Sequence, residues 1–273
     1  MKALSKILLA CAVSVLALNG AVGQEKPAAT AYEPKSGQAG KDVVWVPTPQ
    51  ALVDRMMEMA SVTKEDYLID LGSGDGRTVI TAAKRGVRAL GIEYNADMVA
   101  LSRRNAKEAG VTDLATFVQG DIFESDFSTA TVVTLFLLPA LNVRLRPMLL
   151  DMKPGTRVVS NSFDMGDWEP DERVEAGGEC TSYCRAMKWI IPAKVGGNWK
   201  LDNGELQLTQ TYQMLTGTLI MDGKAEPISA AKMDGESITF TAGGKRYDGR
   251  VADRAMTGTV EGGGSWRAAR AAE

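Results

Sequence analysis

Apolar and polar positions between residues 48 and 161 fall into two alternating patterns. Short runs rich in Val, Ile and Leu predict buried strands at 67–71, 87–93, 115–119, 131–138 and 157–161. Amphipathic stretches with apolar residues at helical spacing predict helices at 48–59, 77–85, 95–109 and 140–152. Strict alternation of strands and helices is typical of a parallel sheet that helices cover on both faces.

The pattern changes after residue 192. Short alternating runs are separated by Asn-Gly, Asp-Gly and Gly-Gly pairs, at 203–204, 222–223, 234–235 and 243–244. Turn signals at this spacing are typical of an antiparallel meander, sandwich or small barrel. We therefore predict an α/β fold over residues 42–192, built on a doubly wound, mostly parallel sheet. Its antiparallel edge strands are expected at 173–176 and 183–191. A small antiparallel all-β C-terminal domain follows over 195–273.

The first part of the chain lies outside both patterns. Lys2 and Lys6 precede an apolar run at 7–18, and small residues at a cleavage site follow, which is the layout of a secretory signal peptide over residues 1–23. The run is too short for a permanent membrane anchor. Residues 24–41, rich in Ala, Gly, Pro, Lys and Gln, predict a flexible linker. We expect an exported chain in the bacterial periplasm with no integral span after cleavage; tethering through an uncleaved signal is the alternative.

Composition narrows the chemistry that the chain can perform. The 273 residues carry a net charge of −3 and no basic cluster, which argues against a nucleic-acid partner. The absence of histidine excludes an imidazole base, a Ser-His-Asp triad and a histidine-rich metal site. Beyond the signal, Cys180 and Cys184 could bridge the mouth of a hairpin but would lie too far apart on an extended strand, so a disulfide stays open. Two thiols alone do not make a metal site, and no metal is predicted.

The first predicted strand runs into the turn Asp70-Leu71-Gly72-Ser73-Gly74-Asp75-Gly76-Arg77. Its three glycines let the backbone turn sharply and approach a ligand, and the following helix directs its first amides at the same place. Arg77 stands where the dinucleotide pattern G-x-G-x-x-G needs its third glycine, which argues against a Rossmann oxidoreductase. Asp70 would repel a pyrophosphate and attract a cationic sulfonium or ammonium group. The better ligand is therefore S-adenosylmethionine.

Acidic residues end the next two strands as well. Glu93 can accept hydrogen bonds from both ribose hydroxyls of such a cofactor, with Tyr94 packing beside the ribose or adenine. Asp121 can accept from the adenine amino group, with Ile122 stacking on the ring. Because the carboxyl ends of parallel strands share one edge of a sheet, we expect one site. Its predicted cofactor-binding residues are Asp70, Gly72, Ser73, Gly74, Gly76, Glu93, Tyr94, Asp121 and Ile122.

Residues 43 to about 192 resemble a class I, Rossmann-type S-adenosylmethionine-dependent methyltransferase. The glycine turn at 70–77 resembles that of the ATP synthase c-subunit lysine methyltransferase family and its bacterial relatives. Val46-Pro47-Thr48-Pro49 and Asp167-Trp168 are similar to the flanking motifs of that family. The resemblance implies a seven-strand Rossmann-like methyltransferase sheet and N-methylation of a protein lysine side chain (EC 2.1.1 class). The signal peptide and the β-rich C-terminal domain are not family features.

The predicted substrate pocket is formed by Thr48, Phe136, Phe163 and Trp168. The three aromatic residues are candidates for an apolar or cation–π wall around a lysine stem, and the alternative is that they are core residues. The run Phe136-Leu137-Leu138-Pro139 lacks the polar residue that amide and base N-methyltransferases often carry here, which argues against planar amide substrates. No general base stands out, and the catalytic residues stay unassigned. The rival hypothesis is an exported, non-catalytic nucleoside-binding or envelope scaffold protein whose β-rich domain docks on a partner.

Overall fold

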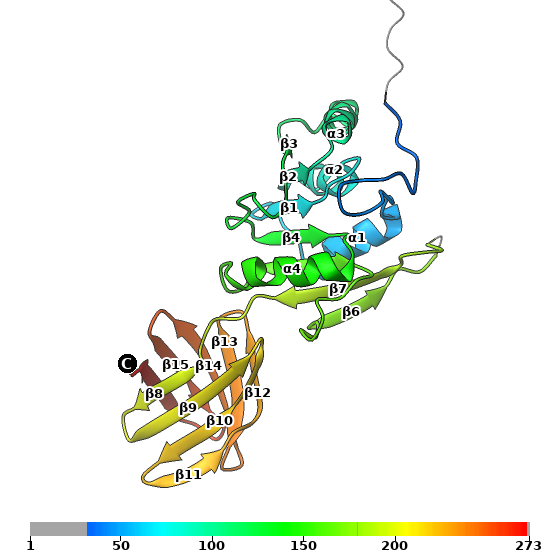
Figure 1. The fold of residues 1–273 in the computed structure, drawn as a ribbon. Coiled ribbons are helices and arrows are strands. Elements are labelled where there is room, and N and C mark those ends of the chain that lie inside the picture. Colours follow the sequence, from blue (N-terminus) through cyan, green and yellow to red (C-terminus); the bar gives the residue numbers. More distant parts are fainter. Residues whose placement is uncertain (1–31, 179, 272–273) are drawn as a thin grey trace, which may run out of the picture. The chain divides into compact units, whose positions relative to one another are not determined.

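The computed structural model describes residues 32–178 and 180–271 (Figure 1). The predicted signal peptide, and the predicted linker as far as residue 31, lie outside the described residues. Within them, no helix is both long enough and apolar enough to cross a bilayer.

Seven strands form the first sheet, in the order β3-β2-β1-β4-β5-β7-β6. Strands β1 to β5 run parallel, and β7 is antiparallel to both of its neighbours. The predicted doubly wound, mostly parallel Rossmann-like sheet is confirmed. The strands are β1 (Tyr67–Leu71), β2 (Arg88–Glu93), β3 (Ala115–Gln119), β4 (Val132–Leu135), β5 (Arg157–Asn161), β6 (Glu172–Glu175) and β7 (Arg185–Ile190).

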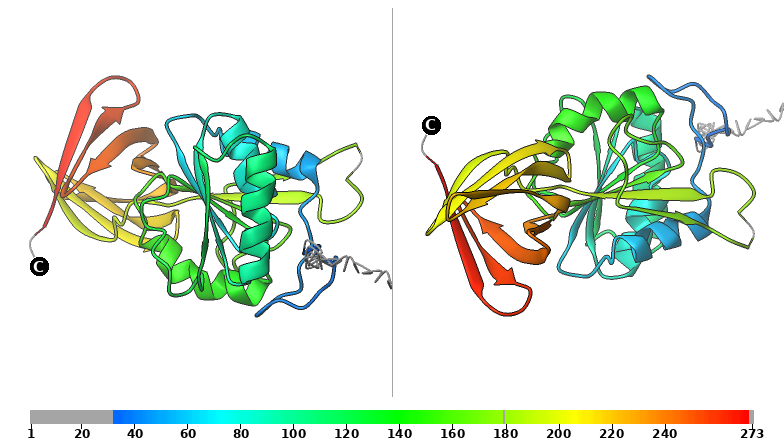
Figure 2. Two further views of the ribbon diagram at one scale, coloured as in Figure 1. Left: turned by 90° about the horizontal axis from the view of Figure 1, so that it is seen from above. Right: turned by 90° about the horizontal axis from the view of Figure 1, so that it is seen from below.

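Helices cover both faces of this sheet, α4 on one side and α1 on the other (Figure 2). They are α1 (Gln50–Met59), α2 (Arg77–Lys84), α3 (Ala96–Glu108) and α4 (Pro139–Leu150). Successive strand residues point to opposite faces, so Leu68 packs with α1, α2 and α3 while Ile69 packs with α4. Asn95 caps α3 as expected, because its side chain accepts from two backbone amides.

The fourth strand is shorter than predicted. We expected it to reach residue 138, but β4 ends at Leu135 and Leu138 already stands before the first turn of α4. Residues 136–138 are apolar, like the strand, yet they line a cavity at the edge of the sheet. Hydrophobicity alone could not separate a cavity wall from a buried strand.

The C-terminal strands close into a barrel. Their pairing order is β11-β10-β12-β13-β14-β15-β16-β8-β9, and β9 also pairs with β10, which closes the ring. Strand β11 pairs only with β10 and lies outside this ring. Closure removes the free edges that an open sheet would expose, and Trp199, Phe240 and Trp266 fill the interior. The predicted small all-β domain is thereby confirmed as a closed barrel. The strands are β8 (Gly197–Leu201), β9 (Gly204–Thr211), β10 (Met214–Met221), β11 (Lys224–Pro227), β12 (Ser229–Asp234), β13 (Ser237–Ala242), β14 (Lys245–Ala252), β15 (Ala255–Val260) and β16 (Ser265–Arg270).

The tip of the β9–β10 hairpin contacts the segment between β5 and β6. Gln213 accepts a hydrogen bond from Nε1 of Trp168 at 2.8 Å and donates another to the carbonyl oxygen of Glu169 at 2.8 Å. The ring of Tyr212 stacks on Trp168, with ring centroids 5.6 Å apart, and its hydroxyl bonds to Asp167. One hairpin tip therefore satisfies polar groups of a fully buried tryptophan and its neighbours.

We predict that Gln213→Ala lowers the free energy of unfolding by about 1–3 kcal/mol, because it leaves the indole N–H of Trp168 buried without an acceptor. Urea unfolding followed by tryptophan fluorescence measures the change. The matched control is Gln207→Ala on the exposed side of β9, for which we expect a change within about 0.5 kcal/mol. Equal midpoints for the two variants would contradict the role given to Gln213.

Candidate active site

A cavity of about 510 Å³ opens at the carboxyl edge of the parallel strands. This volume lies in the usual range for small-molecule sites. The predicted cofactor-binding residues that line it are Asp70, Gly72, Ser73, Gly74, Glu93, Tyr94, Asp121 and Ile122. Eight of the nine residues predicted from the sequence therefore line this one cavity.

The exception is Gly76, which does not line the cavity. It has φ +83° immediately before α2, and a Cβ atom there would lie 2.8 Å from the ring of Phe117 and 2.9 Å from Ser102. Gly76 is thus required for close packing of α2 against β3 and α3 rather than for contact with a ligand. Gly91 in β2, which the sequence analysis missed, has a related role: a Cβ there would lie 2.5 Å from the hydroxyl oxygen of Ser73.

Hydrogen bonds fix the turn after β1. The amides of Gly72 and Ser73 donate to the carbonyl oxygen of Ile92, and the hydroxyl of Ser102 donates to the carbonyl of Gly74 at 2.7 Å. Gly72 has φ +80° and Gly74 φ +55°, conformations that favour glycine. The buried hydroxyl of Ser73 has no hydrogen-bond partner among the described residues. The turn is therefore rigid before any ligand arrives.

Asp70 is a buried carboxylate whose side chain accepts a hydrogen bond from Thr134 of β4 at 2.6 Å. Loss of hydration raises the pKa of Asp70 to about 7, and the nearby charges of Glu93 and Asp75 act in the same direction. No ion pair of Asp70 is found within the described residues. A cationic group beside Asp70 would therefore stabilise the ionised form of this carboxyl and lower its pKa.

Glu93 has a fixed orientation at the end of β2. One carboxylate oxygen accepts from the amide of Gly74 and the other from the amide of Asn95, each at 2.9 Å. A carboxylate oxygen has two lone pairs, so each can accept a further hydrogen bond. Glu93 therefore presents two aligned acceptors to the cavity.

Asp121 is paired with a lysine that the sequence analysis did not assign to the site. Lys41 forms an ion pair with Asp121, which lowers the pKa of the carboxyl and raises that of the lysine. The ammonium of Lys41 also lies 4.8 Å from the ring centroid of Tyr94. Lys41 thus links two residues at the predicted adenine end of the cavity.

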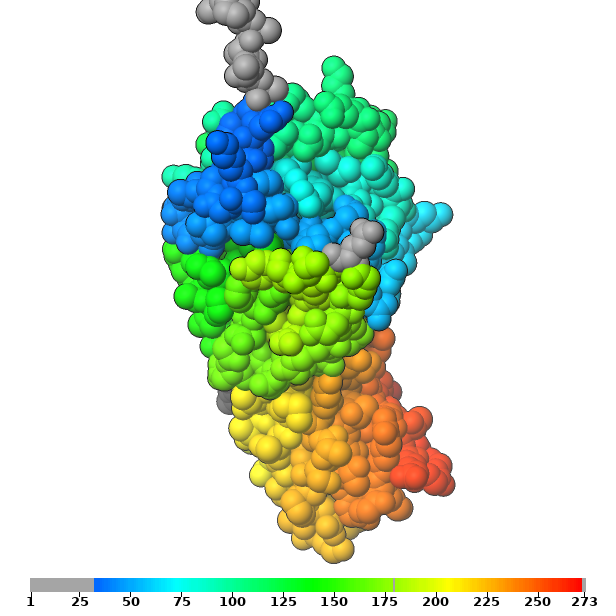
Figure 3. Space-filling view, turned by 90° about the vertical axis from the view of Figure 1, so that its right-hand side faces the viewer, coloured from blue at the N-terminus to red at the C-terminus, as the bar shows by residue number. Residues whose placement is uncertain are grey.

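The segment that carries Lys41 is ordered by its own hydrogen bonds. The amide of Gly37 donates to Trp45 and that of Trp45 to Gln38, while Ala39 and Val44 form an antiparallel bridge. We expected a flexible linker up to residue 41; the interpretation was wrong from residue 35 onward, because paired backbone groups and cavity contacts fix this segment. Figure 3 shows the region, in blue, on the surface of the molecule.

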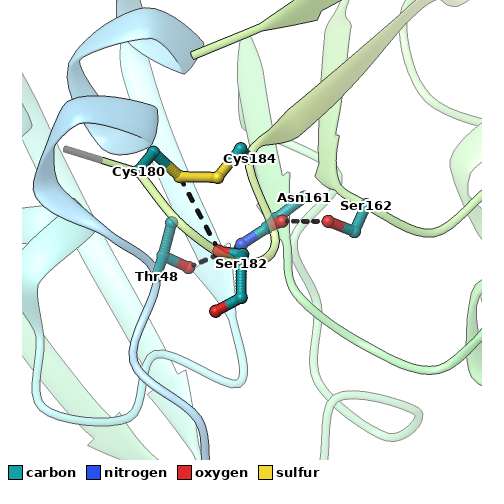
Figure 4. The surroundings of a disulfide bond; sticks show 6 residues. All are labelled: Thr48, Asn161, Ser162, Cys180, Ser182 and Cys184. Carbon is teal, nitrogen blue, oxygen red and sulfur yellow. Dashed lines mark hydrogen bonds between the residues drawn. A yellow bond between two sulfur atoms is a disulfide. The ribbon is translucent and has the colours of Figure 1, made fainter. Parts of the chain in front are cut away.

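The residues of the predicted substrate pocket separate into two groups. Thr48, Phe136 and Phe163 line the cavity, and the rings of the two phenylalanines stack with centroids 6.1 Å apart. Thr48 accepts a hydrogen bond from Asn161 at 3.2 Å (Figure 4). Trp168 does not line it: the side chain is fully buried against Trp189 and bonded to Gln213, so its assignment to the pocket was wrong.

Cys180 and Cys184 form a disulfide in the connection between β6 and β7 (Figure 4). Their Cα atoms lie 5.7 Å apart, within the range that a disulfide bridges. Of the two alternatives left open by the sequence, the two cysteines therefore bridge the mouth of a hairpin and do not lie along an extended strand. The bridged loop brings Tyr183 to the cavity, a residue that the sequence analysis did not assign to the site.

Comparison with known proteins finds relatives of the part of the chain that forms this cavity. Residues 70–172 match the family model described as the ANTKMT methyltransferase domain. A protein named protein-lysine N-methyltransferase from Saccharolobus islandicus is 47% identical over 140 residues, which cover 50% of this chain and 87% of the relative. The lysine N-methyltransferase of the ATP synthase c-subunit from Mus musculus is 35% identical over 134 residues, or 49% of this chain and 54% of that protein. The chain thus spans about half the length of the mouse relative.

A solved structure is similar too. It is titled as an RNA methyltransferase from Salinibacter ruber in complex with S-adenosyl-L-homocysteine, with 53% identity, a TM-score of 0.52, and coverage of 55% of this chain and 96% of that one. The sheet and the acidic cavity at its edge define the class, that of methyltransferases that use S-adenosylmethionine. Within this class, the chain belongs to the family of class I enzymes related to the ATP synthase c-subunit lysine methyltransferases. The predicted enzyme class is confirmed.

We predict that Asp70→Asn changes how stability depends on pH. In the cofactor-free native state Asp70 holds its proton up to about pH 7, whereas an unfolded carboxyl loses it near its ordinary value of 3.8. The native state therefore binds more protons between these values, and the contribution of Asp70 to the free energy of unfolding falls as pH rises through this window. The loss is complete about one pH unit above the native pKa of about 7.

Urea unfolding of both proteins at pH 5, 6, 7 and 8 measures this effect. The stability of Asp70→Asn relative to wild type should rise from pH 5 through pH 7 and flatten toward pH 8. Asp113→Asn, at an exposed acid in the turn after α3, is the control and should follow the wild-type profile. Parallel profiles for wild type and Asp70→Asn would show that burial does not perturb this carboxyl.

Proposed function

We propose that the chain transfers a methyl group from S-adenosylmethionine to the side-chain amine of a lysine in a protein substrate. One observation carries the proposal: a single cavity has buried or anchored carboxylates at one part of its wall and stacked aromatic rings at another. The names of the archaeal and murine relatives support lysine as the acceptor.

The residues present fit the cofactor. Asp70 is a buried carboxylate without a cationic partner in the described part of the chain, as expected where the ligand supplies the positive charge. Glu93 offers two free acceptor positions for the ribose hydroxyls. Asp121 keeps lone pairs for the adenine amino group beside its bond to Lys41, with Tyr94 and Ile122 on the same wall. Gly72, Ser73 and Gly74 bring the backbone close to the methionine part.

When bound, the cofactor supplies a methyl group already activated by its attachment to a positively charged sulfur. The chain's own residues then have to hold and align the two reactants, and positioning of this kind is worth roughly 7–11 kcal/mol. The lysine must be a neutral amine at the moment of transfer. The apolar side chains of Leu137, Leu138 and Leu141 in the cavity wall favour that form, because low polarity lowers the pKa of an amine.

RNA is the second acceptor to consider, because the similar Salinibacter ruber structure is titled an RNA methyltransferase. The sequence favours lysine instead. A net charge of −3 provides little attraction for a phosphate backbone, and the first residues after β4 are Phe136, Leu137 and Leu138, which offer no side-chain donor or acceptor to a planar base.

We predict that the protein methylates poly-L-lysine in the presence of S-adenosylmethionine and that Glu93→Ala abolishes this activity. The variant should bind S-adenosylhomocysteine at least tenfold more weakly in calorimetry, because two charge-assisted hydrogen bonds to the ribose are lost at about 1.5–3 kcal/mol each. Glu65→Ala, at an exposed glutamate, is the matched control and should behave as wild type.

Poly-L-arginine and a single-stranded RNA oligonucleotide serve as acceptor controls in the same assay. Transfer to the RNA alone would overturn lysine as the acceptor while leaving the cofactor site intact. Wild-type protein that binds no S-adenosylhomocysteine would overturn the cofactor site itself.

We further propose that the chain is exported and works in the periplasm. The signal-like pattern at residues 1–23 and the Cys180–Cys184 disulfide support this, because disulfides persist in oxidising compartments. We expect the mature N-terminus near Gln24 and the protein in the periplasmic fraction. Cell fractionation with N-terminal sequencing measures both. A full-length chain in the cytosol would refute export, and a full-length chain on the inner membrane would indicate tethering through an uncleaved signal.

A further inference from the structure

Three aromatic rings from separate segments meet in the cavity. Phe136 follows β4, Phe163 follows β5, and Tyr183 lies in the loop between β6 and β7. The ring of Tyr183 meets Phe136 edge-on with centroids 5.2 Å apart, and its centroid lies 6.1 Å from that of Phe163. These distances are those of favourable aromatic pairs. We refer to Phe136, Phe163 and Tyr183 as the aromatic trio.

The aromatic trio lies beside the part of the cavity that faces the cofactor. Leu135, directly before Phe136, pairs with Leu71, which separates Asp70 from Gly72. The other cavity-lining residues near the trio are apolar, including Leu137, Leu138 and Leu141. A positive group entering here therefore meets aromatic rings and leucine side chains rather than carboxylates. Aromatic faces attract alkylammonium groups, and cages of such rings bind methylated lysine.

Tyr183 reaches this position through an unusual backbone conformation. Its φ is +54°, in the left-handed region, which costs a residue with a bulky side chain roughly 1–2 kcal/mol. Such a conformation persists only where the surrounding structure enforces it. The flanking bridge between Cys180 and Cys184 closes the loop, and both cysteines pack against the core formed with α1 and α2.

We propose that Tyr183 is a specificity-determining residue for the acceptor, and that the Cys180–Cys184 disulfide is the device that positions it. The proposal deepens the function proposed above and rests on it. The aromatic trio binds the alkylammonium head group of the substrate or product lysine. Without the bridge, the loop is free to leave the left-handed conformation at residue 183, and the third ring leaves the trio.

The experiment uses the full protein saturated with S-adenosylhomocysteine and titrates it with tetramethylammonium, observed by NMR line broadening. tert-Butanol, a neutral molecule of similar size, is the control probe. Wild type should bind tetramethylammonium and bind tert-butanol much more weakly. Tyr183→Ala should weaken ammonium binding about fivefold, whereas Tyr183→Phe, which keeps the ring, should stay within about twofold of wild type. S-Adenosylhomocysteine affinity should be unchanged in both variants.

The role of the bridge is tested by Cys180→Ser combined with Cys184→Ser. This variant should weaken ammonium binding about threefold, and adding Tyr183→Ala to it should cause no loss beyond that of Tyr183→Ala alone, because both changes act through one ring. With poly-L-lysine, the KM should rise in Tyr183→Ala while kcat changes less. Thermal melting shows that each variant is folded.

The outcomes separate this inference from the function on which it rests. Wild type that binds S-adenosylhomocysteine but not tetramethylammonium, or that binds both probes equally, overturns the inference alone. Unchanged ammonium binding in Tyr183→Ala overturns the role of the tyrosine, and a fully additive triple variant overturns the role of the bridge. Failure of wild type to bind S-adenosylhomocysteine overturns the proposed function and the inference with it.

Discussion

A carboxyl group buried near the end of β1 without a cationic partner is the constraint around which the methyltransferase part of this chain is arranged. Asp70 lacks a cationic partner in the described residues, and its carboxyl accepts hydrogen bonds from the hydroxyls of Thr134, at 2.6 Å, and Thr78. Burial of an unpaired carboxylate opposes folding, so the remaining structure has to offset it. The parallel register places Glu93 on the same edge, and a rigid glycine turn closes over it. The carboxyl group of Asp70 is already dehydrated by burial, so a cationic ligand would not have to displace water from it.

Much of the fold could be predicted because its signals are local. Strand and helix periods, the Asn95 cap and the turn pairs of the barrel each depend on a few consecutive residues. The positions of the carboxylates were predictable for the same reason, since each lies at or just beyond the carboxyl end of a strand. The end of β4 was not, because Phe136, Leu137 and Leu138 are as apolar as the strand before them. The sequence left open whether the C-terminal strands form a meander, a sandwich or a small barrel, because closure depends on the pairing of β9 with β10.

The errors in the site concern residues whose role is set by distant parts of the chain. Trp168 follows Asp167 as the family motif suggests, yet the hairpin tip at Tyr212 and Gln213 covers it and makes it a core residue. Gly76 belongs to the glycine turn in sequence, but no side chain fits there because the ring of Phe117 occupies the space. Lys41 lies in a stretch whose composition is that of a linker, and its partner Asp121 is 80 positions away. No local pattern carries such information.

The two ends of the acidic wall differ in how much affinity each can contribute. Asp121 is already paired with Lys41. A hydrogen-bond donor of the ligand would either replace Lys41 on this carboxylate or share the carboxylate with it, so the net gain in affinity is small. Asp70 has no such partner, and a cation beside it removes an existing destabilisation as well as adding an attraction. Electrostatic selection for the cofactor is therefore concentrated at Asp70, next to the turn at Gly72. At the proposed adenine end, Lys41 neutralises the charge of Asp121, which leaves selection there to shape, stacking and hydrogen bonding.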